Sequence, residues 1–306
     1  MGGPNKNEDV LQMSVITLQK LTIPTLSIKE LDNPTDEVNK KIINAAQLGC
    51  FYVDLTEDWR PAIDSGRSFA EKFPSGKNAF QKIFREDLPI PIGFSVLPGH
   101  QCESFRLVTK DLWNDHLPQE VVKLGDDLVD LSRKVIQATL RAFNVPEHLW
   151  ESATGGSIKE KHSSTFTFNR YVSAKEGNGL PAHKDSGLVT VAFINESGIE
   201  GRICNEKDWS AISPRGQSLL IKFGQNFEMM FAKDPNRPLL SMENRVAHLD
   251  KDQVSFCLYF DQDQESHIHQ IIDDRCEPVP SEKEMKEKMT NLEFQQIIVR
   301  KLFHGK

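Results

Sequence analysis

The feature of this sequence that most restricts its fold is a change of pattern near residue 160. Before that point, apolar residues recur at steps of three and four, which is the spacing of helices with one buried face. After it, short apolar runs are separated by Gly, Pro, Asn and Asp, as in the strands and turns of a sandwich or barrel. We therefore expect an α+β protein that is mainly β, in which helices precede a β-barrel.

The first half is expected to contain one long helix and several shorter elements. The long helix should cover 119–143, where one apolar stripe recurs: Leu124, Leu128, Leu131, Val135, Ala138 and Ala142. A strand at 23–28, a helix from 35 to 49 and a strand at 50–55 should precede it. The segment 77–113 has weak periodicity and three prolines, so a lid over a substrate and an ordinary surface connection both stay open.

The second half is expected to hold the strands of the barrel and a final helix. The expected strands are 165–168, 188–194, 202–205, 218–224, 227–231, 239–248 and 253–260. The helix should begin at Ser281, with one apolar side formed by Met285, Met289, Leu292 and Ile297. We expect four residues from different strand runs to lie together in one β-core: Val191, Trp209, Leu220 and Phe256.

The length suits one domain over residues 1–306, because β-barrel enzymes of this size commonly form a single domain. Within it, residues 1–20 should be a disordered tail and 21–160 a helix-rich part. The β-barrel core should cover 161–262, and a helical segment should close the chain over 263–306.

Charge and cysteine content restrict the partners and the compartment. The net charge of -7 argues against nucleic acid and anionic membranes, which favour basic surfaces. No apolar run approaches the roughly 20 residues of a membrane span, and the polar N-terminus lacks the apolar core of a signal peptide. The five cysteines are scattered and form no CxxC pair, which indicates a reducing compartment. We therefore expect a cytoplasmic protein without a nucleic-acid or membrane partner.

The residues best suited to chemistry are His183 and Asp185, in the run LPAHKDSGLVT. Side chains two positions apart on a strand project to the same face, so an imidazole and a carboxylate would meet here. They are two of the three ligands of the facial triad that binds Fe(II) and leaves positions open for oxygen and a chelating acid. Taken alone, the pair is also the pattern of a polar loop before a strand.

Other runs, in the same order along most of the chain, add to this pair. They are Ile23-Pro24 with Leu26, LGCFY at 48–52, Asn169-Arg170-Tyr171, GIE at 198–200, WSAI at 209–212 and SLLIKFG at 218–224. In these runs the chain resembles the iron(II)- and 2-oxoglutarate-dependent oxygenases of the isopenicillin N synthase-like group. The resemblance implies a double-stranded β-helix, or jelly-roll, barrel with a helical N-terminal half and a C-terminal helix. It also implies Fe(II) and 2-oxoglutarate as cofactors.

The third metal ligand departs from the family pattern. The resemblance implies a histidine directly before Arg245-Val246, yet Asn244 stands there, and an amide oxygen is a weaker ligand for ferrous iron. His248 is four residues further on, and at about 3.3 Å per residue it would lie roughly 13 Å away unless the strand is bulged. We expect His183 and Asp185 as metal ligands, with Asn244 and His248 both open as the third.

The co-substrate site departs from the pattern as well. The family holds the distal carboxylate of 2-oxoglutarate with an Arg-x-Ser pair, which here reads Gln253-Val254-Ser255. The resemblance implies that Tyr171 and Ser255 hold the co-substrate, without the two-pronged guanidinium. Lys222 or Arg245 could supply the charge from another strand, but each taken singly is expected to be a solvated surface cation.

The resemblance implies a cytoplasmic enzyme that uses Fe(II), 2-oxoglutarate and O2 to hydroxylate, desaturate or cyclise a small molecule. Two alternatives stay open. The missing arginine favours an iron oxidase of the same fold that does not use 2-oxoglutarate. The two departures together favour a catalytically silent homologue that binds a ligand or a partner.

Overall fold

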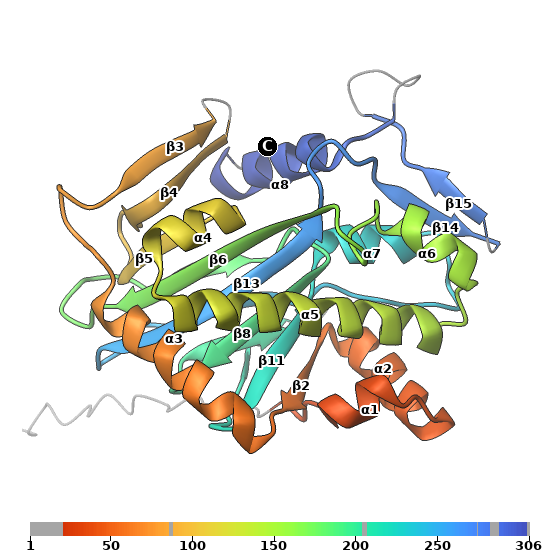
Figure 1. The fold of residues 1–306 in the computed structure, drawn as a ribbon, viewed down its shortest axis with the longest axis horizontal. Helices are drawn as coiled ribbons and strands as arrows, with labels where there is room; N and C mark the ends of the chain where they lie inside the picture. The colour runs from red at the N-terminus through yellow and green to blue at the C-terminus, as the bar shows by residue number, and fades with distance from the viewer. Residues whose placement is uncertain (1–20, 86–87, 204–206, 274, 282–287, 305–306) are drawn as a thin grey trace, which may run out of the picture.

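A computed structural model describes residues 21–304 except 86–87, 204–206, 274 and 282–287. Its largest element is a nine-stranded sheet (Figure 1). In spatial order its strands are β1 (Thr25–Ser27), β2 (Cys50–Asp54), β11 (Ser218–Phe223), β8 (Val189–Ile194), β13 (Gln253–Gln262), β6 (His162–Tyr171), β5 (Cys102–Leu107), β4 (Leu88–Val96) and β3 (Gln81–Arg85). Apart from the parallel pair of β1 and β2, neighbouring strands in this sheet are antiparallel.

A four-stranded sheet accompanies the large one. It is ordered β10 (Ser210–Ala211), β9 (Ile199–Arg202), β12 (Glu243–Val246) and β7 (Leu180–His183). A separate hairpin joins β14 (His269–Ile272) to β15 (Arg275–Pro278). The described part of the chain thus forms open sheets, and its hydrogen-bonded strands do not close into the barrel that the sequence predicts.

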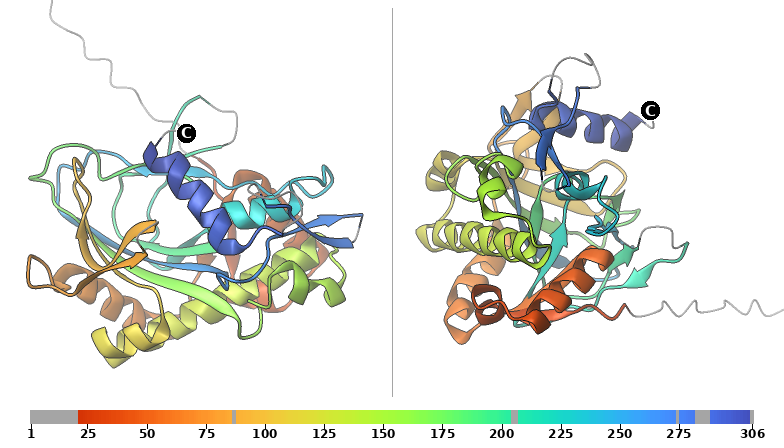
Figure 2. Two further views of the ribbon diagram at one scale, coloured as in Figure 1. Left: turned by 90° about the horizontal axis from the view of Figure 1, so that it is seen from above. Right: turned by 90° about the vertical axis from the view of Figure 1, so that its right-hand side faces the viewer.

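The helices lie mostly against the large sheet. They are α1 (Ile28–Asp32), α2 (Asp36–Leu48), α3 (Arg60–Lys72), α4 (Lys110–His116), α5 (Gln119–Ala142), α6 (Glu147–Ala153), α7 (Gln225–Phe231) and α8 (Asn291–His304), with a short 3-10 helix at Glu57–Trp59. The long helix α5 runs across one face of the sheet, and α3 lies beside it (Figures 1 and 2). No helix in the described ranges is both long and apolar enough to span a bilayer.

The two faces of the large sheet differ in chemistry. On the face toward α3 and α5, strands β5, β6, β8 and β13 present fully buried apolar residues: Phe105, Phe166, Phe168, Val191, Phe256 and Leu258. The residues between them alternate to the opposite face, as a period of two requires. That opposite face carries polar residues on β5, β6 and β13, and it packs against the four-stranded sheet through a smaller apolar cluster that includes Leu220, Ile212 and Met242.

Several predicted elements agree with the structure. The helix predicted over 119–143 is α5, and the stripe named for it is buried. The helix predicted from residue 35 is α2, where the Thr35 side chain accepts a hydrogen bond from the Val38 amide. It ends at Gly49, whose φ of 84° places it in the left-handed region.

Other predictions were wrong. The apolar run 227–231 is part of helix α7, because Phe227, Met230 and Phe231 are buried at helical spacing. The segment 77–113 is no plain surface connection in the described residues, since it supplies β3 to β5 and the start of α4, and part of it lines the cavity described below.

The last helix and the expected β-core also differ from prediction. Helix α8 begins at Asn291 rather than Ser281, while Met285 and the predicted tail over 1–20 lie outside the described residues. The four residues expected in one core are divided, because Val191 and Phe256 belong to the main cluster and Leu220 to the smaller one on the other face. Trp209 is only half-buried and stacks under arginine side chains.

Candidate functional site

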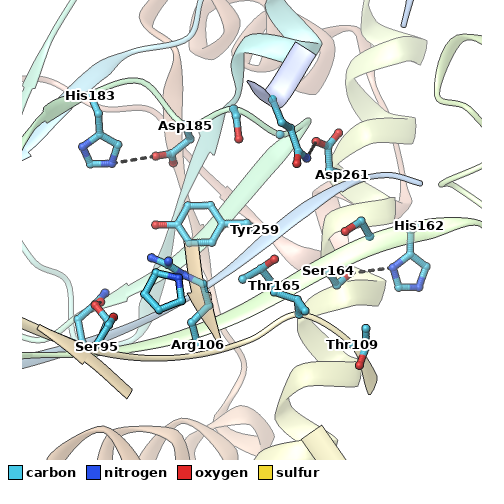
Figure 3. A pocket seen from close by; sticks show the side chains of 18 of the residues that line it. Ser95, Arg106, Thr109, His162, Ser164, Thr165, His183, Asp185, Tyr259 and Asp261 are labelled. Atoms are coloured by element: carbon cyan, nitrogen blue, oxygen red, sulfur yellow. Dashed lines mark hydrogen bonds and ion pairs between the residues drawn. The ribbon is translucent and has the colours of Figure 1, made fainter. Parts of the chain in front are cut away.

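A cavity of about 1230 Å³ opens on the polar face of the large sheet. Its walls come from β4, β5, β6, β13 and the chain that runs from β7 into the following loop, with residues of α4 and α5 at one side. Figure 3 shows His183 and Asp185 at one end, Tyr259 and Arg106 in the middle, and His162 with Ser164 at the other end. A cavity of this size holds a drug-sized organic molecule.

His183 and Asp185 lie together at the end of β7, as their spacing predicts. Nε2 of His183 is 3.4 Å from Oδ1 of Asp185 (Figure 3). Nδ1 of His183 is 2.9 Å from the Pro181 carbonyl oxygen, which fixes the ring with Nε2 toward Asp185. The structure therefore brings one imidazole and one carboxylate to the same edge of the cavity.

The loop that carries Asp185 is held by main-chain hydrogen bonds at the start of α7. The amide of Gln225 donates to the Asp185 carbonyl at 2.8 Å, and the amide of Gly224 donates to the Leu188 carbonyl at 3.0 Å. A Cβ atom on Gly224 would lie 1.9 Å from the carbonyl oxygen of Gly187. Glycine at 224 is therefore what allows this close approach of the two chain segments.

Asn244, not His248, is the residue beside this pair. Asn244 is the direct partner of His183 in the register of β12 and β7, and its Nδ2 donates to the His183 carbonyl at 3.1 Å. The side chain of His248 is 53% exposed, and its Nδ1 is 2.7 Å from the Gly177 carbonyl oxygen. Of the two residues left open as third ligand, only Asn244 contacts the His183–Asp185 pair.

Lys222 completes this cluster, and the expectation of a solvated surface cation at this position was wrong. It is 5% exposed, and its Nζ is 2.7 Å from Oδ2 of Asp185 and donates to Oδ1 of Asn244 at 3.0 Å. The ammonium group of Lys222 and the carboxylate of Asp185 form a buried ion pair. Burial raises the pKa of Asp185, but the charge of Lys222, together with His183, outweighs it and holds the pKa below the usual range.

This donor set does not fit a ferrous ion in the arrangement that the structure shows. A facial triad offers three anionic or imidazole ligands around one cation. Here the carboxylate of Asp185 and the amide of Asn244 contact the ammonium group of Lys222, which already supplies the positive charge, and the imidazole of His183 contacts Asp185. In the described ranges, no group of three His, Cys, Asp or Glu side chains is arranged to hold a metal.

The residues expected at the co-substrate form a polar chain beside the cavity. Ser104 donates to Oδ1 of Asn169 at 2.8 Å, and Nδ2 of Asn169 donates to Ser255 at 3.3 Å. The hydroxyl of Tyr171 lies 3.4 Å from that of Ser255. Burial raises the pKa of Tyr171 well above its usual value, so its hydroxyl keeps its proton.

Neither cation suggested from sequence supplies a charge to this polar chain. Arg245 pairs with Glu200 at 2.5 Å and stacks over Trp209 at 4.2 Å, and Lys222 is held by Asp185. Arg106 lines the cavity from β5 (Figure 3). Its guanidinium has no ion pair or hydrogen bond with any residue that the structure describes.

The alternation of β5 was the signal that sequence reasoning passed over. Cys102, Ser104 and Arg106 stand two apart, and they alternate with Phe105 and Leu107, which are buried. Read as a strand, this run predicts one apolar and one polar face. The alternation was not recognised because the longer segment 77–113, which contains β5, has three prolines before this strand and weak periodicity overall.

A second buried carboxylate, Asp261, borders the cavity. It accepts hydrogen bonds from Nδ2 of Asn226 at 2.7 Å, from the Gln262 amide at 2.8 Å and from Nε2 of Gln295 at 3.0 Å. Burial, only partly offset by these donors, raises the pKa of Asp261 to about 6. A carboxyl group with a raised pKa keeps its proton in the folded state at pH values where the unfolded chain has lost it.

Asp261 should therefore lower the stability of the protein as the pH rises from about 4 to 6. The difference in unfolding free energy between Asp261→Asn and wild type should therefore change with pH. From pH 4.5 to pH 7 we expect it to shift by about 2 kcal/mol in favour of the variant. Urea unfolding at both values measures this difference. Asp250→Asn, at a side chain that is 96% exposed, is the control and should show no such trend. A pH-independent difference for Asp261→Asn would show that Asp261 is ionised throughout.

Comparison with known proteins gives likeness in structure but not in sequence. No family model matches the chain, and no curated protein matches it by sequence. Three solved structures illustrate the structural likeness. JOX2, in complex with 2OG, Fe and JA, has a TM-score of 0.66 and 18% identity, covering 93% of this chain and 87% of its own.

The other two neighbours agree. A full-length Neurospora crassa protein, solved in complex with alpha-KG and 5-formyluracil, has a TM-score of 0.67 and 16% identity, covering 98% of this chain and 99% of its own. The rice dioxygenase for auxin oxidation has a TM-score of 0.68 and 16% identity, covering 93% and 96%. At such identities the likeness concerns the fold. This chain therefore has the fold of the 2-oxoglutarate- and iron-dependent oxygenases.

Proposed function

We propose that this protein binds a small organic acid in the cavity, with the acid group paired to Arg106. The observation that carries the proposal is the position of this guanidinium, which lines the cavity and has no partner among the described residues. A buried or half-buried arginine is most stable when a carboxylate or phosphate meets its planar fork of donors. The unpaired charge therefore selects an anionic ligand.

The surroundings of Arg106 support a small, polar ligand rather than a macromolecule. Arg106 on β5 is the register partner of Thr167 on β6. Ser104 and Asn169 form the next partner pair on the same face of these two strands. Tyr259 closes the same part of the cavity (Figure 3). These hydroxyl and amide groups can orient the ligand, while the formal charge of -7 gives no broad basic surface for a polyanion.

Arg106→Met tests the proposal. The change keeps most of the side-chain length and removes the charge, so an organic acid should bind at least about tenfold more weakly. A panel of mono- and dicarboxylates, including 2-oxoglutarate, would be screened by thermal shift against wild type, and the best binder titrated by calorimetry. Arg67→Met, on the exposed side of α3, is the matched control. An acid that binds wild type and Arg106→Met equally well would contradict the proposal.

A second candidate function is the oxidation of a small molecule with Fe(II), 2-oxoglutarate and O2. It is favoured by the fold and by the meeting of His183 and Asp185, and it requires that a metal ion replace the Lys222 ammonium beside Asp185. In this reading Asn244 or His248 would be the third ligand, and Tyr171 and Ser255 would hold the co-substrate. The names of the solved neighbours refer to 2OG, iron and small molecules.

Product analysis separates this candidate from the others. Succinate formed in step with oxygen uptake would support the 2-oxoglutarate-dependent reaction. Oxygen uptake with iron but without succinate would support an oxidase of the same fold. Ligand binding without succinate formation and without oxygen uptake would support a catalytically silent binding protein with the same fold.

A further inference from the structure

We propose that the ammonium group of Lys222 takes the place of the metal ion in this fold, so that His183, Asp185 and Asn244 form a metal-free centre around a cation built into the chain. The proposal concerns a different part of the cavity from Arg106 and does not depend on which ligand binds there. It rests on the position, the burial and the hydrogen bonding of these four side chains.

The position of Nζ is the first argument. It lies 2.7 Å from Asp185 and 3.0 Å from Asn244, and Asn244 is the strand partner of His183. A divalent transition metal bound to Asp185 would sit about 2 Å from the carboxylate oxygen. It would then share one buried carboxylate with the ammonium group, and two cations in a buried site repel each other strongly.

The hydrogen bonds of Asn244 are the second argument. Its Oδ1 accepts from the ammonium group, while its Nδ2 donates to the His183 carbonyl at 3.1 Å. Both the oxygen and the nitrogen of the Asn244 amide thus form hydrogen bonds, and the oxygen accepts from the Lys222 ammonium group. An amide suits this role, because it offers an acceptor and a donor at once.

The route of the Lys222 side chain is the third argument. Lys222 stands on β11, opposite Thr190 of β8 and Cys50 of β2, on the polar face of the large sheet. Its side chain crosses from this sheet to the residues at the edge of the small one, and it is 7% exposed. Both neighbouring strands are hydrogen-bonded to β11, so Lys222 projects from the interior of the sheet and not from its edge.

Metal titration in the absence of organic ligand tests the proposal. Wild type should show no stoichiometric binding of Co(II) or of Fe(II) under anaerobic conditions, by calorimetry and by elemental analysis after gel filtration. The double variant Lys222→Met, Asn244→His removes the cation and supplies an imidazole. It should bind one Co(II) per chain at least a hundredfold more tightly than wild type, with visible absorption bands and a higher melting temperature.

Two further variants make the result specific. Lys184→Met with Asn244→His removes a neighbouring lysine that pairs with Glu228 and keeps Lys222, so it should stay close to wild type in metal affinity. Adding Asp185→Asn to the double variant should abolish the gained binding. Wild type that binds one metal ion per chain, in a manner lost with Asp185→Asn, would overturn the proposal even if the double variant does not fold. A folded double variant without metal binding would overturn it as well.

Discussion

Lys222→Met is expected to destabilise the protein by about 3–5 kcal/mol, because it leaves the carboxylate of Asp185 buried without a counter-charge. The two side chains are 7% and 1% exposed, so water cannot replace the lost partner. Asn244 would also lose the donor to its Oδ1. Urea unfolding at pH 7 measures the change in unfolding free energy.

Two companion variants separate loss of charge from loss of packing. Lys222→Met combined with Asp185→Asn removes both charges and should recover a large part of the stability, because no ion then remains unpaired. Lys184→Met breaks a more exposed pair with Glu228 and should cost no more than about 1 kcal/mol. If Lys222→Met cost as little as Lys184→Met, Asp185 would have another counter-charge or would take up a proton.

Phe256→Ala is the second change with a large expected effect, about 3–5 kcal/mol. The ring is fully buried in the middle of β13 and stacks on Phe193 with ring centroids 5.0 Å apart. Phe166 meets it edge-on, and the ring lies so close to Gly66 of α3 that a Cβ there would be 2.9 Å away. Neighbours on several sides prevent the site from collapsing around the missing ring.

Denaturant unfolding would measure this loss, with Val96→Ala as the control. Val96 is 45% exposed near the end of β4, so its truncation should change the unfolding free energy by less than about 0.5 kcal/mol. A loss below about 2 kcal/mol for Phe256→Ala would mean that the layer between the sheet and α3 repacks, and that it is less rigid than the ring contacts indicate.

The parts of the fold that could be predicted from sequence are those with a strong local period. Helix α5 repeats its apolar stripe over 24 residues, which gave its bounds to within one residue. Helix α7 has only seven residues, too few to distinguish a helix from a buried strand by period alone. Strands β3 to β5 pair mainly with each other and with β6, and such long-range pairing leaves little trace in a proline-containing run.

The candidate site divides in the same way. His183 and Asp185 are two residues apart, so their meeting follows from strand geometry alone. The place of Asn244 beside His183 was one of two possibilities left by the resemblance, and the register of β12 with β7 decides between them. Lys222 reaches the pair only because β11 lies next to β8. This long-range strand pairing cannot be predicted from the local sequence pattern.

The large sheet turns its phenylalanine layer to the helices and its polar residues to the cavity. The residues on one face can therefore be substituted during evolution without changes on the other face. Substitutions at cavity positions such as Ser104 and Thr165 remove little buried apolar area, so they leave most of the folding free energy in place. Relatives of this protein can thus acquire new ligands while they keep the same phenylalanine layer. Lys222 is the exception, because we expect its loss to be tolerated only together with a second change in the same cluster, at Asp185 or at Asn244, and this coupling makes the centre the slowest part of the cavity to change.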